Sequence, residues 1–225
     1  MKYAGFRTFF IVCLWKIIPM CLCAQTPGYL GMRHSIMGEI SAMPSVFEKN
    51  STINTTFSGR YQFILSRNIT VGAMYNSFST QMGYLSPFTQ RAGRANLTGW
   101  GLGMNVRWFN FFKLGVIAPL GPYQQFELLY SQYNITDRFG RYFPAPNNII
   151  GKPLGAKRQI SVGFAIGMQR IVYKYITFHY GIKTAYVLPL DLDKVTDTYI
   201  DKTASRRMRN FSAIMVTGGI GVLIF

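Results

Sequence analysis

The sequence predicts an all-β protein, an eight-stranded antiparallel up-and-down β-barrel that crosses a membrane. Only 14% of its 225 residues are charged, whereas 49% are hydrophobic and 16% are aromatic. An average globular chain is about 25% charged, so this composition disfavours an ordinary soluble domain. Apolar and polar residues alternate with a period of two in one segment after another, which is the pattern of β-strands. No apolar run long enough for a transmembrane helix follows residue 25, which excludes a helical membrane protein.

The N-terminal segment has the layout of a secretory signal peptide. Lys2 and Arg7 precede an apolar run from Phe9 to Leu22, and the small residue Ala24 marks the expected cleavage site. This run is about fourteen residues long, too short for a membrane-spanning helix of about twenty. We therefore expect residues 1–24 to be a cleaved signal peptide and residues 25–225 to form the barrel domain.

All three cysteines, Cys13, Cys21 and Cys23, lie within this expected signal peptide. A lipid anchor on Cys21 or Cys23 is the alternative to simple cleavage. A lipid-accepting cysteine normally follows a small residue, whereas Met20 and Leu22 precede these two. We therefore expect a mature chain without a lipid and without any thiol for a disulfide or a metal site.

The first four expected strands follow in order. In each, large apolar residues occupy one face, and polar or small residues occupy the other. The fourth is the clearest, because one face carries only large apolar side chains, from Trp100 to Trp108, and the other carries glycine, asparagine and arginine. These strands are expected at Met32–Ser41, Ile53–Leu65, Ile69–Asn76 and Gly99–Trp108.

Four more segments complete the predicted barrel. The fifth, sixth and seventh alternate in the same way, and the eighth is apolar on both faces with glycines inside it. They are expected at Tyr123–Tyr130, Ile160–Met168, Ile176–Lys183 and Asn210–Phe225. The sheet must close on itself, because an open edge in hydrocarbon would leave backbone groups unpaired at a cost of several kcal/mol each.

The connections between these segments alternate in length, as in outer-membrane barrels with short periplasmic turns and longer external loops. Short links are expected at residues 66–68, 109–122 and 169–175, and longer polar loops at residues 43–52, 80–97, 131–159 and 189–209. Aromatic residues gather at two of the short links, where an interfacial belt is expected. They are Trp108, Phe109, Phe111, Phe112, Tyr173 and Tyr175.

These features together resemble the small outer-membrane β-barrel proteins of Gram-negative bacteria, the OmpA/OmpX-like group. The resemblance covers residues 29–225 and rests on the signal ending at Ala24, the alternating strands, the Ala118–Gly121 kink and the terminal Phe225. It implies a transmembrane barrel in the cell outer membrane. It also implies that Phe225 belongs to a signal read by the barrel-assembly machinery, although Gly219 and Gly221 are smaller than that pattern usually carries. It implies no activity.

Six ionisable residues are expected on the inward faces of the strands. The interior of an eight-stranded barrel is just wide enough for side chains to fill it, so these groups should pair with one another. We interpret them as a polar network that seals the lumen of a non-enzymatic structural or interaction element, or of an accessory subunit of an outer-membrane complex. A narrow channel is the alternative. The expected lumen network is Glu39, Arg60, Arg107, Glu127, His179 and Lys183.

A lipid-modifying barrel enzyme is a further alternative. Such barrels use a histidine with a serine and a carboxylate, and this chain has two histidines, His34 and His179. His34 is expected on the lipid side near the periplasmic end, and His179 is expected inside at a similar depth. Neither lies at the external rim, where lipid A would present its acyl chains, so we predict no enzyme, no catalytic residue and no cofactor.

The charge balance points to anionic partners. Removing Lys2, Arg7 and Lys16 with the signal lowers the net charge from +16 to +13. Basic side chains near the outer rim can pair with phosphates of lipopolysaccharide. The residues expected to make this contact are Arg206, Arg207 and Arg209.

Other partners follow from the predicted location. Outer-membrane lipid, the assembly machinery and other outer-membrane proteins are expected, whereas nucleic acid would need a soluble basic surface. Four acids crowd residues 191–201, between lysines and without the spacing of a calcium loop, so a solvated face is favoured and calcium stays open. They are Asp191, Asp193, Asp197 and Asp201.

Overall fold

The computed structural model of the 225-residue chain describes residues 31–43, 54–109, 118–144, 146–147, 149–195 and 198–225. The expected signal peptide, residues 1–24, and the aromatic residues Phe111 and Phe112 lie outside the described residues. No helix within the described ranges is long and apolar enough to cross a membrane.

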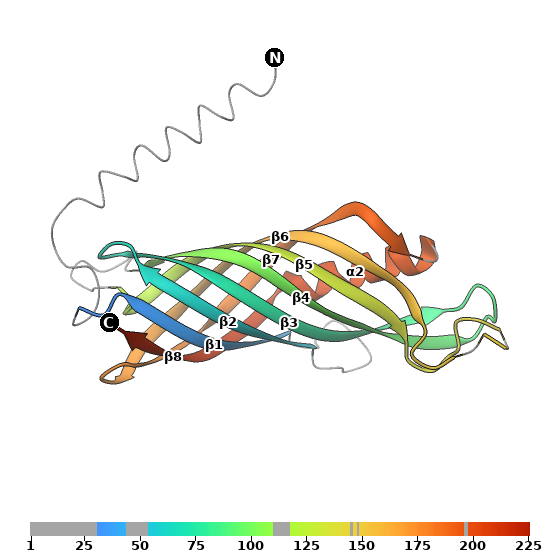
Figure 1. The fold of residues 1–225 in the computed structure, drawn as a ribbon, viewed down its shortest axis with the longest axis horizontal. Helices are drawn as coiled ribbons and strands as arrows, with labels where there is room; N and C mark the ends of the chain where they lie inside the picture. The colour runs from blue at the N-terminus through green and yellow to red at the C-terminus, as the bar shows by residue number, and fades with distance from the viewer. Residues whose placement is uncertain (1–30, 44–53, 110–117, 145, 148, 196–197) are drawn as a thin grey trace, which may run out of the picture.

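Eight strands form a closed barrel in the described residues, which confirms the predicted fold class (Figure 1). Each strand pairs antiparallel with the next along the chain, and β1 pairs with β8 to close the ring. The strands are β1 His34–Met43, β2 Asn54–Ile64, β3 Ile69–Leu85, β4 Ala92–Phe109, β5 Gly121–Asp137, β6 Pro153–Tyr173, β7 Ile176–Val195 and β8 Met215–Ile224.

The strands fall into two length classes. β1, β2 and β8 have 10 or 11 residues, whereas β3 to β7 have between 17 and 21. β3 pairs with β2 only as far as Ser79, and β7 pairs with β8 only as far as Lys183. The long strands therefore continue past the ring as a five-stranded sheet. We call residues 80–97, 131–159 and 184–213 the extension and the ring itself the closed section.

The extension corrects the prediction of long polar loops at residues 80–97, 131–159 and 189–209. β3 and β4 pair up to Leu85 and Ala92, and β5 and β6 pair up to Thr136 and Pro153. Residues 80–85, 92–97, 131–137, 153–159 and 189–195 are strand, because each of these stretches has a neighbouring strand long enough to pair with it. The end of the third expected loop is helix, and so is the start of the eighth expected strand, so that β8 begins only at Met215.

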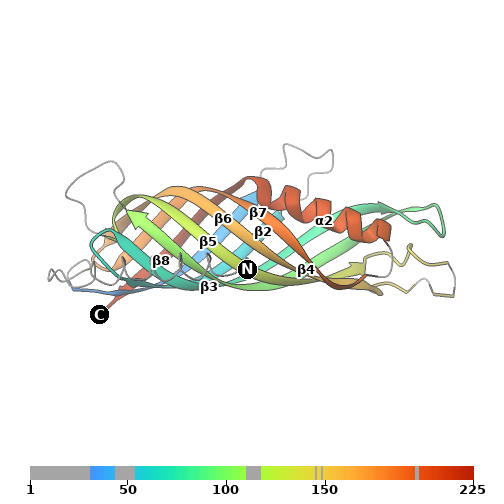
Figure 2. The same cartoon turned by 90° about the horizontal axis from the view of Figure 1, so that it is seen from above.

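One helix, α2, spans Thr198–Ala213 and returns the chain from the extension to β8. It lies along the extension in both views (Figures 1 and 2) and contacts β7 and β3, the two strands with unpaired edges. Ile200, Ala204 and Met208 recur every four residues, so they share one face of the helix, and all three are buried. α2 thereby covers the side of the extension that β8, β1 and β2 are too short to reach.

In the closed section, apolar side chains face outward and polar side chains face inward, as the alternation predicts. On β4 the outward positions from Trp100 to Trp108 are large and exposed, and Asn105 and Arg107 between them are buried. Eight residues of strand span about 26 Å, or about 20 Å across a membrane at the tilt of such barrels. This matches the apolar band of an outer-membrane barrel, which is about 25 Å tall.

The arrangement reverses in the extension. Outward positions on β4 become Arg94, Asn96 and Thr98, while the inward Ala95 and Leu97 are fully buried. Inward apolar side chains from four strands, the loop after β5 and α2 form one cluster, which we call the external apolar layer. It comprises Phe78, Met82, Tyr84, Ala95, Leu97, Tyr133, Ile135, Tyr142, Leu154, Ile200, Ala204 and Met208. The extension therefore has the core of a water-soluble domain.

Candidate functional site

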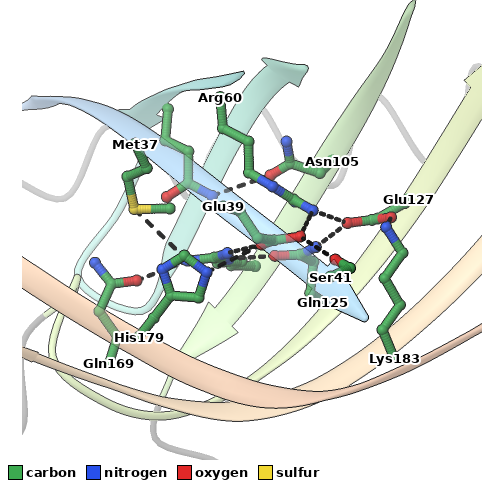
Figure 3. A network of polar contacts seen from close by, with 12 residues as sticks. Met37, Glu39, Ser41, Arg60, Asn105, Gln125, Glu127, Gln169, His179 and Lys183 are labelled. Carbon is green, nitrogen blue, oxygen red and sulfur yellow. Dashed lines mark hydrogen bonds and ion pairs between the residues drawn. The ribbon is translucent and has the colours of Figure 1, made fainter. Parts of the chain in front are cut away.

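The structure brings all six residues of the expected lumen network together in the middle of the closed section (Figure 3). Arg60 on β2 lies between the two carboxylates. Its Nη2 atom is 2.6 Å from Glu39 Oε1 and 2.6 Å from Glu127 Oε1. Because β2 and β5 are not neighbours in the ring, this contact crosses the lumen and connects its two walls.

Each carboxylate has further partners. Glu39 Oε2 is 3.0 Å from His179 Nε2 and 3.7 Å from Arg107 Nη2. Glu127 pairs with the Lys183 ammonium through Oε2 and accepts a hydrogen bond from the Gln125 amide through Oε1. Three cations thus compensate two carboxylates in a space without room for bulk water, which is the condition under which buried charges are tolerated.

Arg107 is the residue that joins the network to the end of the lumen where the short β2–β3 and β6–β7 turns lie. Its Nε donates to Gln125 Oε1, and its Nη1 donates to Gln169 Oε1 at 2.7 Å. Its guanidinium also lies 4.4 Å from the ring centroid of Tyr123, a cation–π contact. Gln169 falls in a stretch expected to be a short link, residues 169–175, so it was not among the expected lumen residues. Its inward position follows from the alternation of β6, in which Ala165, Gly167 and Gln169 share one face.

A glycine makes room for the histidine. A Cβ atom on Gly219 would overlap His179 Cε1 and the backbone oxygen of Gly38. Gly219 is the β8 residue opposite Glu39 and also the one opposite His179. Gly219 is smaller than the residue that an assembly signal usually carries at this position. It has a packing role instead, because the absence of a side chain allows the His179 imidazole to reach Glu39 across β8.

The lumen is stratified along its length in the described residues. At the end with the short turns, a buried apolar cluster, which we call the short-turn cluster, is formed by Ile64, Phe109, Ala118 and Tyr123. The charged network follows next along the barrel axis, and the external apolar layer lies beyond the network, toward the extension. Between these two layers is a cavity of about 40 Å³, lined by polar side chains such as Ser131 and Ser161 and by Met208 of α2. Such a volume holds a few water molecules.

Two of the expected aromatic positions differ in role. Trp108 is exposed on the outer wall and Tyr173 and Tyr175 are exposed at the β6–β7 turn, as an interfacial belt requires. Phe109 is fully buried instead, because the next residue after an outward position on a strand points inward. It contributes to the short-turn cluster and not to the belt.

The three arginines expected to contact lipopolysaccharide lie on α2 and point in different directions. Arg206 and Arg209 are exposed. Arg207 has 5% of its surface exposed, and its Nε lies 3.4 Å from Thr80 Oγ1 on the inner side of β3. The prediction is therefore wrong for Arg207, which the helical period turns toward the core.

The terminal residue lies just beyond β8, which ends at Ile224. Phe225 has 82% of its surface exposed, whereas Leu223 is buried inside the barrel. The lipid-facing residues of this strand end are Val222 and Ile224. Leu223 and Phe225 are alternate positions of the chain, but they do not share an outward face in the barrel.

Of the four acids in the β7–α2 region, Asp201 alone has a described side chain. The side chains of Asp191, Asp193 and Asp197 lie outside the described residues. Asp201 Oδ1 is 2.5 Å from Lys157 Nζ, and the described residues hold no group of three or more His, Cys, Asp or Glu placed to bind a metal ion.

No protein-family model and no curated protein sequence matches the chain. Solved structures do match its fold. Neisserial surface protein A aligns at 10% identity over 85% of this chain and 97% of its own, with a TM-score of 0.48. The N-terminal β-barrel domain of Pseudomonas aeruginosa OprF aligns at 9% identity over 86% and 98%, with a TM-score of 0.45. Yersinia pestis Ail aligns at 8% identity over 85% and 97%, with a TM-score of 0.40. These are small outer-membrane barrels of the OmpA/OmpX kind, and the likeness concerns the fold alone.

Proposed function

We propose that the protein is a non-conducting, non-enzymatic barrel of the outer membrane, whose closed section anchors the extension outside the cell as a structural and interaction element. One observation carries the proposal: three successive layers of side chains and α2 fill the lumen. The exposed band of apolar residues around the closed section supports insertion in a bilayer, since soluble proteins rarely expose so large an apolar surface.

The contacts around His179 support a structural role over catalysis. Ser41 Oγ donates to Glu39 Oε1 at 3.3 Å, and His179 Nε2 lies on the other oxygen of the same carboxylate. In a nucleophilic triad the histidine stands between the serine and the acid, so that it can take the hydroxyl proton. Here the acid stands between them, and all three groups are buried.

Planar-bilayer recording tests the proposal. Purified wild-type protein should insert without steady conductance at modest voltage. Protease protection of the reconstituted protein checks insertion independently, and a known porin recorded in the same bilayer is the positive control for conductance. Steady conductance by the wild type would reject the sealed lumen and support the narrow channel.

We also propose that the exposed face of α2 contacts the phosphates of outer-leaflet lipopolysaccharide through Arg206 and Arg209. α2 runs from the far end of the extension toward the start of β8 (Figure 1), so its last turns approach the membrane. Guanidinium groups bind phosphate in a bidentate manner. Replacing both arginines with glutamine should lower the amount of lipopolysaccharide that co-purifies in mild detergent. Unchanged co-purification would contradict this contact.

A further inference from the structure

We propose that a groove at the far end of the extension binds an anionic sugar, a saccharide that carries a carboxylate or a phosphate. The groove has a volume of about 460 Å³, within the range of small-ligand sites. It is formed where the β3–β4 hairpin, the loop after β5 and the first turn of α2 meet. Its main lining residues are Gly83, Gly93, Arg94, Phe139, Arg141 and Tyr199.

The floor of the groove owes its shape to two glycines. A Cβ atom on Gly93 would overlap the ring of Tyr84, so the glycine lets that ring lie across the hairpin. Tyr84 OH donates to Asp137 Oδ1 at 2.6 Å, and burial together with this bond raises the pKa of the Tyr84 phenol. At Gly83 a Cβ atom would meet nothing within 4 Å, so the space there is open.

The walls combine cationic and aromatic groups. Phe139 and Tyr199 are each 45% exposed, which leaves ring surface open to a ligand. The Arg141 guanidinium lies 5.6 Å from the Phe139 ring and within 3.5 Å of the Ala92 carbonyl oxygen, so it is held at the groove. Arg94 lines the groove from β4.

This set of groups fits an anionic sugar better than other small ligands. Guanidinium groups recognise carboxylate and phosphate through paired hydrogen bonds. Aromatic rings offer a flat apolar surface to the C–H face of a sugar ring. Because the groove is open to solvent, the hydroxyl groups of a bound sugar can stay hydrated, whereas an apolar anion would keep apolar surface in water. A neutral sugar would leave both guanidinium groups without a counter-charge.

The nearby acid does not cancel this positive charge. Asp137 is buried, and its two oxygens accept hydrogen bonds from the Tyr84 hydroxyl and from the backbone amides of Phe139 and Tyr142. Asp201, the other described acid of the extension whose contacts are known, pairs with Lys157. Within the described residues, the groove therefore presents two cations and no lining carboxylate.

Binding is measured by calorimetry on the full-length mature protein in detergent, with trigalacturonate as the anionic probe and maltotriose as the neutral one. Trigalacturonate should bind at least tenfold more tightly than maltotriose. Arg94→Gln together with Arg141→Gln should abolish that preference. Arg170→Gln together with Lys174→Gln removes the same charge from exposed positions near the β6–β7 turn, at the opposite end of the barrel from the groove, and should leave binding within twofold of the wild type.

A second variant removes the space and keeps every charge. Gly83→Leu fills open volume at a position with ordinary backbone geometry, so it should fold normally and lower affinity for trigalacturonate by tenfold or more. Unchanged affinity in Gly83→Leu, or equal losses in the groove variant and in the Arg170 and Lys174 control, would overturn the proposal, because either result means general attraction to a basic protein.

Two sources of anionic sugar can be separated in the same assay. Core oligosaccharide released from lipopolysaccharide carries both carboxylate and phosphate, and its competition with trigalacturonate would place the ligand in the protein's own membrane. Binding of trigalacturonate without such competition would indicate that the natural ligand is an anionic sugar from outside the protein's own membrane. The groove inference uses the proposed function only to say that the extension lies outside the cell. Since binding is measured without a membrane potential or a conductance, its failure is distinct from failure of the sealed lumen.

Discussion

The closed section and the extension share strands β3 to β7, but their apolar side chains face opposite ways, outward in the closed section and inward in the extension. Along β4, Leu97 is fully buried inside the extension, whereas Leu102, five positions further along, is 54% exposed on the outer wall. The boundary lies at Trp100, which is paired with Ser77 and Gln132 in the neighbouring strands. A single strand therefore crosses from a water-surrounded apolar core into a lipid-surrounded polar core.

The comparison explains why the two regions are closed differently. Hydrocarbon tolerates no unpaired backbone, so the membrane part must be a complete ring. Water can satisfy a free strand edge, so the extension can be an open sheet whose remaining side is covered by α2. The charged network belongs to the first region, and the apolar layer and the groove belong to the second.

The largest expected effect comes from breaking the charged network. Glu127→Gln leaves Arg60 and Lys183 under-compensated in the lumen, and it should lower the free energy of unfolding by about 3 to 5 kcal/mol. Asp201→Asn removes a carboxylate of the extension whose side chain is 37% exposed, so its loss should cost at most about 1 kcal/mol. Urea unfolding in lipid vesicles, followed by tryptophan fluorescence, measures both. Similar costs would remove the distinction between the two regions.

The second-largest effect is expected from a charge introduced on the outer wall, which should be costly in the closed section and not in the extension. Met104 is 71% exposed midway between Trp100 and Trp108, so Met104→Arg should cost about 2 to 4 kcal/mol in a bilayer. Thr98→Arg places the same side chain outward on the same strand just outside the expected membrane, where its cost should be close to zero. The same unfolding assay applies, and a costly Thr98→Arg would move the boundary outward.

Truncation of an apolar residue tests the extension core. Leu97→Ala should cost about 2 to 3 kcal/mol, at the low end for a buried leucine because α2 can move toward the space. Leu102→Ala removes the same atoms from the lipid face, where an acyl chain fills the gap, and should cost less than about 1 kcal/mol. Equal losses would indicate that both leucines face a protein core.

Deletion of Phe225 should have the smallest effect on the finished barrel. The residue lies beyond β8 and is largely exposed, so the change in unfolding free energy should stay below about 0.5 kcal/mol. Assembly should suffer more, with less protein in the outer membrane and more periplasmic degradation. Immunoblots of fractionated cells measure this, and unchanged levels would place the assembly signal elsewhere.

The sequence was sufficient to predict the closed section because one physical rule applies throughout it. Period-two alternation placed Glu39, Arg60, Arg107, Glu127, His179 and Lys183 on inward faces, where the structure has them. It could not indicate that Arg60 joins both carboxylates, because that contact depends on the diameter of the closed ring.

The extension was missed because its alternation is inverted and its residues are polar on average. Ala95 and Leu97 continue the inward positions of β4, but small and apolar residues there do not look like the polar interior of the closed section. Ile200, Ala204 and Met208 carried a helical spacing that the surrounding Lys and Arg residues obscured. A reversal of the inside and outside pattern along one strand is the signal that would have revealed both.

The most direct test of this account is a nitroxide scan along the outward positions of β4. All three cysteines lie in the expected signal peptide, so a protein produced from Gln25 onward contains none, and single cysteines can be introduced into it at Arg94, Asn96, Thr98, Leu102, Met104 and Val106. The account predicts that labels at the first three positions collide mainly with a water-soluble nickel reagent and that labels at the last three collide mainly with oxygen dissolved in lipid. A uniform profile along β4, or a change of environment elsewhere than at Trp100, would contradict it.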